Sequence, residues 1–202
     1  MQRRYLKNLR KRFRTFNEES VRAWAENNYG DWLKNIQQQD TEPDSPCERF
    51  YRYYTQGIGE VVNQHLRSGA EIDSFFQDGP VTTDMMQAAI AEMHMLPCPD
   101  DIVTYRYVDP KVWGLMKRDA SLIYDLAFLS TTLTRDTVAQ RRYACNKHSY
   151  LMEIFVPKGT PCAYVELIAD MQENELLFPP KTKLRILSKP LLSKRISCII
   201  EN

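Results

Sequence analysis

The pattern of apolar residues changes near residue 100, and this change limits the folds that the chain can adopt. Before it, apolar side chains recur at helical spacing in three segments, residues 18–38, 48–67 and 83–95. From residue 102 onward, short β-branched and aromatic runs alternate with turns. Helices followed by strands favour the α+β class. We therefore expect an N-terminal helical region over 1–100 that packs on a β-rich core over 101–202, the two together forming one domain.

Breakers and caps refine the predicted helices. The stretch Asn27–Gly30 leaves the first segment as one or two helices, and Gly57 weakens the second. Thr82 or Thr83 provides a side-chain oxygen that can cap the third helix. A further helix is predicted over 110–118, inside the β-rich region.

Charge and composition argue against several classes of protein. The formal net charge is +1, which gives no general reason to expect a nucleic acid partner. Five cysteines and three histidines are scattered, so we expect neither a disulfide framework nor a metal site, and the thiols should be reduced as in a cytosolic setting. No apolar run is long enough to cross a bilayer, and none follows the basic start of the chain as in a secretory signal.

Cations crowd the first fourteen residues of the chain. They are Arg3, Arg4, Lys7, Arg10, Lys11, Arg12 and Arg14, with apolar and aromatic residues between them. A basic amphipathic helix of this kind can make weak contact with an anionic membrane surface or bind a partner. The alternative is a solvated helix that packs one apolar stripe on its own domain.

Two acids stand at the start of a predicted strand near the C-terminus. Glu173-Asn174-Glu175 leads directly into Leu176-Leu177-Phe178-Pro179. Because side chains alternate along a strand, both carboxylates should point to one face, about 7 Å apart. Neighbouring acids resist simultaneous ionisation, so the pair is a candidate for chemistry on a developing positive charge. The solvated face of an ordinary strand gives the same pattern.

Two earlier segments carry polar side chains inside apolar runs. Arg106 interrupts the run Val103–Val108, and a guanidinium in such a strand needs an anionic partner, either a structural carboxylate or a bound phosphate. Ser130, Thr131 and Thr132 stand together between apolar residues. Their hydroxyls can satisfy nearby backbone groups or hold the rotamer of an acid.

In chain order, the strand arginine, the hydroxyl cluster and the Glu-x-Glu motif resemble the signature of mono-ADP-ribosyltransferases, in the branch that includes bacterial toxins and effectors. The strand and Pro-x-Gly-Thr turn at 151–160 and the strand, proline turn and strand at 175–187 are similar to the same family. The resemblance extends from about residue 20 to the end and is strongest after residue 97. It implies a β-sandwich core of two packed sheets with an NAD cleft, flanked by helices. Consistently, the chain has no Gly-x-Gly-x-x-Gly motif of a Rossmann domain.

The resemblance also implies roles for individual residues. Glu175 would stabilise the sugar cation that forms when the nicotinamide–ribose bond of NAD breaks, as a carboxylate does in glycoside cleavage. Glu173 would orient or deprotonate the acceptor side chain. Ser130 would steady Glu175, with support from Thr131 and Thr132. The other NAD contacts would be Arg106 on a phosphate, the backbone of Tyr107 on the nicotinamide amide, and Tyr54 and Asn63 on the preceding helix.

The implied activity is transfer of ADP-ribose from NAD to a host protein, without a metal. Arginine is the default acceptor because relatives that modify arginine carry Glu at the position of Glu173, while threonine or another side chain stays open. Thr132 replaces a serine of the family motif, and Met171 stands in a loop where many toxins present an aromatic residue. Ubiquitin, small GTPases and actin are candidate targets. A secreted bacterial effector that acts in host cytosol would suit the reduced cysteines.

Two other functions are compatible with the same residues. An NAD glycohydrolase would use Glu175 and Arg106 with water as the acceptor, so that Glu173 would be dispensable. A binding module would keep the cleft without catalysis and use the basic N-terminus to contact a membrane or RNA.

Overall fold

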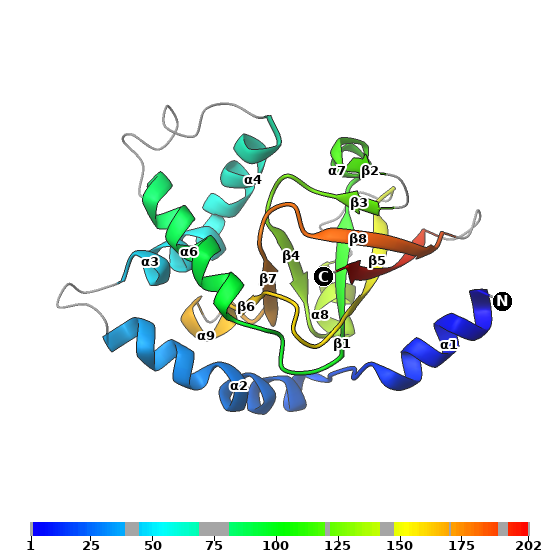
Figure 1. The fold of residues 1–202 in the computed structure, drawn as a ribbon, viewed down its shortest axis with the longest axis horizontal. Helices are drawn as coiled ribbons and strands as arrows, with labels where there is room; N and C mark the ends of the chain where they lie inside the picture. The colour runs from blue at the N-terminus through cyan, green and yellow to red at the C-terminus, as the bar shows by residue number, and fades with distance from the viewer. Residues whose placement is uncertain are drawn as a thin grey trace.

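Helices dominate the chain up to residue 95, and strands dominate after residue 102 (Figure 1). The computed structural model describes residues 2–38, 45–68, 81–119, 122–141, 148–169, 171–189 and 194–201. The helical elements are α1 (Gln2–Arg12), α2 (Glu18–Gln38), α3 (Pro46–Tyr53), the π-helical η1 (Tyr54–Ile58), α4 (Gly59–Ser68), α6 (Thr83–Met95), α7 (Pro110–Leu115), α8 (Arg135–Arg141) and α9 (Glu166–Ala169). The strands are β1 (Ile102–Val108), β2 (Lys117–Asp119), β3 (Leu122–Tyr124), β4 (Leu129–Thr132), β5 (Tyr150–Val156), β6 (Ala163–Tyr164), β7 (Glu175–Phe178), β8 (Lys183–Ser188) and β9 (Arg195–Glu201).

Helix α6 has its predicted bounds, and helix α2 is continuous. The hydroxyl of Thr82 accepts a hydrogen bond from the backbone N–H of Met85 at 3.2 Å, which confirms the predicted cap of α6. Helix α2 runs through Asn27–Gly30 without a break. Tyr29 and several of its neighbours on α2 are buried, and their packing outweighs the weak helix propensity of Asn and Gly.

A π-helical turn divides the second predicted helix into α3 and α4. Gly57 has φ 118°, a value that L side chains rarely adopt, so it interrupts the helix. Gly59 lies so close to the preceding turn that a Cβ atom there would be 2.8 Å from the carbonyl oxygen of Tyr54. The turn lets α4 restart with Asn63 in reach of Tyr54, whose hydroxyl accepts a hydrogen bond from Asn63 Nδ2 at 2.7 Å.

The strands form one mixed sheet in the order β2-β3-β8-β9-β5-β1-β4-β7-β6. Strand β1 pairs with β5 along its whole length in antiparallel register, and β5 pairs with β9 in parallel. Strands β1 and β4 share a single registered pair, Tyr105 with Thr132. We expected two packed sheets. In the structure, the two groups of strands are connected into one continuous hydrogen-bonded sheet, and the connection between them is narrow because it consists of the single pair Tyr105–Thr132. Strands β4, β7 and β6 lie on one side of the junction, next to the helices α3, α6 and α9 (Figure 1).

The main core lies between the sheet and helices α2, α3, α4 and α6. Phe50 of α3 and Phe128, just before β4, are fully buried, and their ring centroids are 5.3 Å apart. Burial of one such side chain stabilises a fold by about 1.5–3 kcal/mol. This contact fixes the helical layer against the end of β4, beside the residues of the hydroxyl cluster.

Helix α1 covers another face of the sheet and has a smaller core of its own. Its apolar side chains pack on the face of β1 that carries Val103 and Tyr105, whereas Ile102 belongs to the main core. The buried residues of α1 and its end are Leu6, Leu9 and Phe13. The ring of Phe13 meets Phe155 of β5 edge to face, with centroids 5.3 Å apart. Of the two alternatives for the basic N-terminus, the structure therefore shows a helix whose apolar stripe packs on its own domain.

Ion pairs hold α1 against the sheet and the start of β1. Arg10 donates to the carboxylate of Glu153 on β5, with 3.0 Å between Nε and Oε1. Burial opposes ionisation of Glu153, but the hydrogen bonds from Arg10 and Ser197 hold its pKa below the ordinary value. Arg12 donates to Asp101 at 2.7 Å, next to the start of β1.

Helix α7 ends at Leu115, earlier than predicted, because Lys117–Asp119 form β2 and pair with β3. Pro110 occupies its first turn, and the carboxylate of Asp109 accepts a hydrogen bond from the N–H of Lys111 at 2.8 Å.

Within the described residues, no helix combines the length and the apolar character needed to cross a membrane.

Candidate active site

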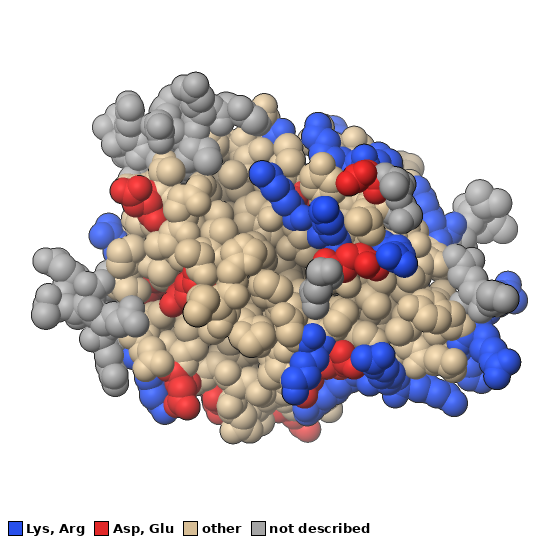
Figure 2. Space-filling view, viewed as in Figure 1, with Lys and Arg blue, Asp and Glu red and all other residues tan. Residues whose placement is uncertain are grey.

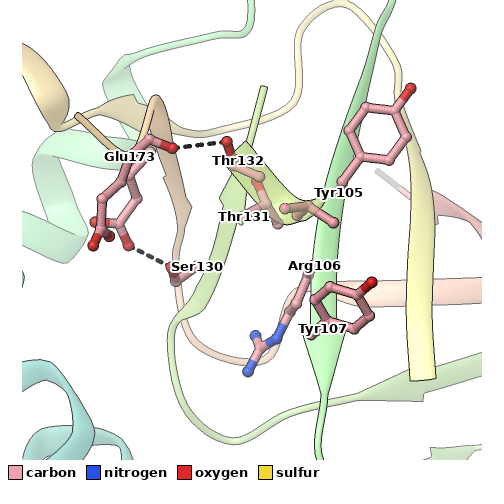
Figure 3. Close-up of a pocket in the computed structure, with 9 residues that line it drawn as sticks. Tyr105, Arg106, Tyr107, Ser130, Thr131, Thr132 and Glu173 are labelled. Carbon is pink, nitrogen blue, oxygen red and sulfur yellow. Dashed lines mark hydrogen bonds between the residues drawn. The ribbon is translucent and has the colours of Figure 1, made fainter. Parts of the chain in front are cut away.

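Arg106 lies on β1, and its side chain points away from the ring of Tyr105 (Figure 3). Its Nη1 atom is buried and has no hydrogen-bond partner among the described residues. Burial lowers the pKa of this guanidinium, and the carboxylate of Asp125 acts in the opposite direction. Arginine nevertheless stays protonated in proteins, so β1 presents a fixed positive charge with an unsatisfied donor. An anionic ligand group would satisfy both.

The hydroxyls of β4 connect this strand to the segment that carries the two glutamates. The Ser130 hydroxyl donates a hydrogen bond to the carboxylate of Glu175 (Figure 3). The Thr132 hydroxyl donates to the backbone carbonyl of Glu173 at 2.7 Å, and the Thr131 hydroxyl donates to a carbonyl of β7 at 3.0 Å. Ser130 thus holds an acid side chain, while the two threonines fix the backbone around it.

The two glutamates line one cavity, but not through the strand alternation expected from sequence. Strand β7 begins at Glu175, so Glu173 precedes it. Asn174 between them has φ 50°, which is left-handed rather than extended. Glu175 is buried, with 6% of its surface exposed, and Glu173 is partly exposed. A turn, rather than the pleat of a strand, therefore brings the two carboxylates to the same side.

The cavity has a volume of about 210 Å³ and is lined by residues of β1, β4, α8 and the start of β7 with the segment before it. Its lining residues are Tyr105, Arg106, Tyr107, Ser130, Thr131, Thr132, Val138, Glu173 and Glu175. Two of these, Tyr105 and Val138, were not predicted, because they reach the site from the apolar cluster under α1. Small-ligand pockets usually measure roughly 300–1,000 Å³. A dinucleotide would therefore fill this cavity and extend beyond it.

Tyr54 and Asn63, which were predicted to contact NAD, do not line this cavity. Both are buried, and the Asn63 side chain donates to the Tyr54 hydroxyl at 2.7 Å. The Asn63 carbonyl oxygen accepts from the backbone N–H of Phe128 at 3.1 Å. Burial raises the pKa of Tyr54, and the charge of Glu175 adds to this effect, so the phenol stays protonated close to the Glu175 carboxylate. In the structure these two residues join α4 to the start of β4.

Arg67 and Asp125 belong to the same region and were missed in the sequence. Arg67 Nε and Nη2 donate to the two carboxylate oxygens of Asp125 at 2.9 Å and 2.7 Å, and both side chains are largely buried. The pKa of Arg106 responds to the charges of Asp125 and Arg67, so three charged groups stand close together. A signal was present, since Arg67 follows Asn63 by four residues and lies on the same face of α4.

Cysteine and histidine take no part in this cavity, because none of its lining residues is of either type. The described cysteines Cys47, Cys98, Cys162 and Cys198 form no disulfide. Burial raises the pKa of Cys47 and of Cys198 to about 12, so these thiols are protonated at neutral pH. Within the part of the chain that the structure describes, no three His, Cys, Asp or Glu side chains gather as metal ligands.

The fold matches solved structures of bacterial ADP-ribosylating proteins. Plx2a, an ADP-ribosyltransferase toxin from Paenibacillus larvae, aligns with a TM-score of 0.69 at 17% identity, covering 93% of this chain and 98% of Plx2a. The C3 exoenzyme of Clostridium limosum aligns with a TM-score of 0.67 at 16% identity, covering 94% and 98%. C3stau2 from S. aureus, solved with NAD, aligns with a TM-score of 0.64 at 14% identity, covering 95% and 99%. These likenesses establish the α+β fold of ADP-ribosyltransferase toxins.

Comparison of the sequence with known families agrees with the comparison of the fold. No curated protein sequence matches the chain in a direct comparison. The sequence profile of the ADP-ribosyltransferase exoenzymes, however, matches residues 21–201. The chain therefore belongs to the ADP-ribosyltransferase exoenzyme family and is homologous to NAD-dependent mono-ADP-ribosyltransferases. The family and fold class predicted from the order of Arg106, the hydroxyl cluster and the Glu-x-Glu motif are confirmed.

Proposed function

We propose that the protein transfers ADP-ribose from NAD to a side chain of a host protein, with arginine as the default acceptor, and releases nicotinamide. One observation carries the proposal: the Glu175 carboxylate, held by Ser130, lines the same cavity as Arg106. NAD needs a cation for its phosphates and an anion for the sugar cation that forms on cleavage. This cavity offers both charges on fixed strands.

Glu175 supplies the negative charge that bond cleavage requires. When the bond between ribose C1′ and the nicotinamide nitrogen breaks, both bonding electrons leave with nicotinamide, and positive charge develops on the sugar. A buried carboxylate that Ser130 already orients stabilises this charge with little reorganisation. By resemblance, the same carboxylate accepts a hydrogen bond from the ribose 2′-hydroxyl. The acceptor side chain then attacks C1′ and loses a proton.

Arg106 and its neighbours would hold the dinucleotide. The unsatisfied Nη1 donor of Arg106 suits a phosphate oxygen, and Arg67 adds a second guanidinium nearby. Among the described residues, β1 registers with β4 at Tyr105 alone. The backbone of Tyr107 therefore lies beyond the paired part of this edge and is our candidate partner for the nicotinamide amide. Tyr54 and Asn63 would act indirectly, by holding the helical region and the β-rich core as one domain.

Arg106→Ala is expected to weaken NAD binding by about 10- to 100-fold, because a charge-assisted hydrogen bond to a buried group is lost. Isothermal titration calorimetry in a Glu175→Gln background measures the affinity without turnover of NAD. Arg106→Lys is the matched control. It keeps the charge but not the planar fork, so its affinity should lie between those of the alanine variant and the parent. Equal affinity in all three proteins would remove Arg106 from the NAD site.

Glu173 would act on the acceptor rather than on NAD. Glu173 lines the cavity and is partly exposed, so a guanidinium from solvent could reach its side chain. Vis, another structural match with a TM-score of 0.56, has been solved with the arginine analogue agmatine, which makes agmatine a suitable probe here. Threonine remains the second candidate acceptor. We keep ubiquitin, small GTPases and actin as candidate targets, in host cytosol after delivery from a bacterium.

Incubation of the protein with labelled NAD tests the proposed function. We expect nicotinamide release, labelled agmatine, and one or a few labelled proteins in a host-cell lysate, with the modified residue identified by mass spectrometry. Nicotinamide release without any labelled acceptor would identify an NAD glycohydrolase instead. Absence of NAD binding and of release would favour an inactive binding module.

The solvent-facing side of α1 is the surface that would contact an anionic membrane, because it carries exposed cations. Arg3, Arg4, Lys7 and Lys11 are exposed and make no salt bridge to any residue that the structure describes. Figure 2 shows Lys and Arg gathered at the end of the molecule where α1 lies in Figure 1. The apolar stripe of α1 is used on its own domain, so binding would be electrostatic and sensitive to salt.

We expect weak binding to vesicles that contain phosphatidylserine, because each cation near such a surface contributes about 1 kcal/mol. The double variant Lys7→Gln/Lys11→Gln should bind more weakly in a vesicle co-sedimentation assay. The double variant Lys111→Gln/Lys117→Gln removes two exposed lysines from other elements and should bind like the wild type. Equal sedimentation of both variants would show that α1 is an ordinary solvated helix.

A further inference from the structure

The segment before β7 is held in an unfavourable backbone conformation. Gln172 has φ 57° and Asn174 has φ 50°, both in the left-handed region. A non-glycine residue adopts this region rarely, and glutamine less readily than asparagine. Glu173, the residue proposed to act on the acceptor side chain, lies between the two. The direction of the Glu173 side chain therefore depends on contacts that keep Gln172 and Asn174 in the left-handed conformation.

Glu166 provides one such contact, on the N-terminal side of Glu173. It is the first residue of α9, and its two carboxylate oxygens accept hydrogen bonds from two consecutive backbone N–H groups. The donors are Gln172 and Glu173, the latter at 2.8 Å. A carboxylate that accepts two adjacent backbone N–H groups fixes the peptide plane between them. That plane sets the direction of the Glu173 side chain.

Contacts on the other side of Glu173 come from residues that the sheet already holds. The Glu173 carbonyl accepts from the Thr132 hydroxyl at 2.7 Å, and the Asn174 carbonyl accepts from the N–H of Leu133 at 3.0 Å. The Tyr164 hydroxyl donates to the Asn174 side chain at 3.2 Å. Glu175, one residue further on, has its own hydrogen bond from Ser130 and belongs to β7. Neither the hydrogen bond from Ser130 nor the pairing of β7 with β4 involves the Glu166 side chain.

We propose that Glu166 is a positioning residue for the acceptor half of the reaction: it holds Glu173 in the orientation that receives the acceptor side chain, and it leaves cleavage of NAD to Glu175 unaffected. This inference rests on the proposed transferase function. It adds a residue that affects the reaction of the acceptor, through Glu173, but not the cleavage of NAD. Loss of Glu166 should let residues 172–174 relax toward ordinary backbone angles and turn Glu173 out of place.

The test compares transfer with hydrolysis in a Glu166→Gln variant. A glutamine amide offers one acceptor oxygen and places an NH₂ donor against a backbone N–H, so one of the two hydrogen bonds is lost. Labelling of agmatine should fall about 10- to 100-fold, as expected for a reacting group that is misplaced by about 1 Å. Nicotinamide release with water as acceptor, and the KM for NAD, should stay within about twofold of the wild type, because the groups that act on NAD are untouched.

A second substitution separates positioning from general damage. Asparagine tolerates the left-handed region better than glutamine, so Gln172→Asn in the Glu166→Gln background should restore part of the agmatine labelling. Asp31→Asn, at an exposed position on α2, is the control for loss of one negative charge and should behave like the wild type. If Glu166→Gln does not fold, Glu166→Asp replaces it, since the shorter carboxylate keeps the charge but reaches the two N–H groups less well.

The possible outcomes separate this inference from the proposed function. Wild-type agmatine labelling in the Glu166 variant, or an equal loss of labelling and of nicotinamide release with an unchanged melting temperature, would overturn the inference and leave the transferase in place. A wild-type protein that cleaves no NAD would overturn the proposed function, and this inference with it. Selective loss of labelling with partial recovery by Gln172→Asn supports it.

Discussion

Glu175→Gln is expected to lower nicotinamide release by about a thousandfold, with or without an acceptor, because the charge that stabilises the sugar cation is removed. The substitution keeps the size of the side chain and an oxygen that can accept the hydrogen bond from Ser130. The fold should therefore survive, and a thermal melt should show it. Initial rates of nicotinamide release, measured at saturating NAD, report the effect on the chemical step.

Ser130→Ala is the matched control for this prediction. It leaves the Glu175 charge in place but removes the hydroxyl that orients it, so the rate should fall by much less, about tenfold. A Glu175→Gln variant that released nicotinamide at the wild-type rate would show that this carboxylate does not face the breaking bond.

Glu173→Gln is expected to reduce transfer to agmatine or to an arginine-containing target by about a hundredfold or more, the usual contribution of a general base. Nicotinamide release with water should continue, because Glu175 and Arg106 are unchanged. The two readouts, labelled acceptor and free nicotinamide, are measured on the same reaction mixture. Their separation distinguishes a transferase from a glycohydrolase.

Loss of both readouts in Glu173→Gln would place this residue in NAD cleavage, against our assignment. Retention of both would show that transfer to the acceptor does not need the Glu173 carboxylate, again against our assignment. A combined Glu173→Gln/Glu175→Gln variant should be no worse in nicotinamide release than Glu175→Gln alone, since the two residues act on different partners.

The residues at the centre of the site could be predicted from sequence because their types are unusual where they stand. Arg106 interrupts an apolar strand, three hydroxyls follow one another at Ser130, and two acids precede the apolar run of β7. Such side chains need partners, and the structure brings them to one cavity. Their chain order was sufficient to indicate the family, which the match over residues 21–201 confirms.

Other parts of the site depend on contacts between distant segments, which local patterns do not reveal. The spacing of Arg67 from Asn63 indicates a shared helix face, but the partner of Arg67, Asp125, lies 58 residues later and is found only in the fold. The left-handed turn at Asn174 was hidden because the residues after it form a regular strand. Likewise, β1 and β4 meet at a single pair because of how two distant strands align, and amino-acid composition does not determine this register.

Asp125, whose charge lies near Arg106, also joins three segments beside the site. Its carboxylate takes the bidentate contact from Arg67 of α4 and the N–H of Ala127, and its carbonyl oxygen accepts from the N–H of Lys181 in the turn between β7 and β8. Through these hydrogen bonds, one residue connects α4, the segment before β4 and the β7–β8 turn. A ligand that extends from Arg106 toward Arg67 would meet segments that are already joined, so little of its binding free energy would be lost in bringing the helical layer and the sheet together.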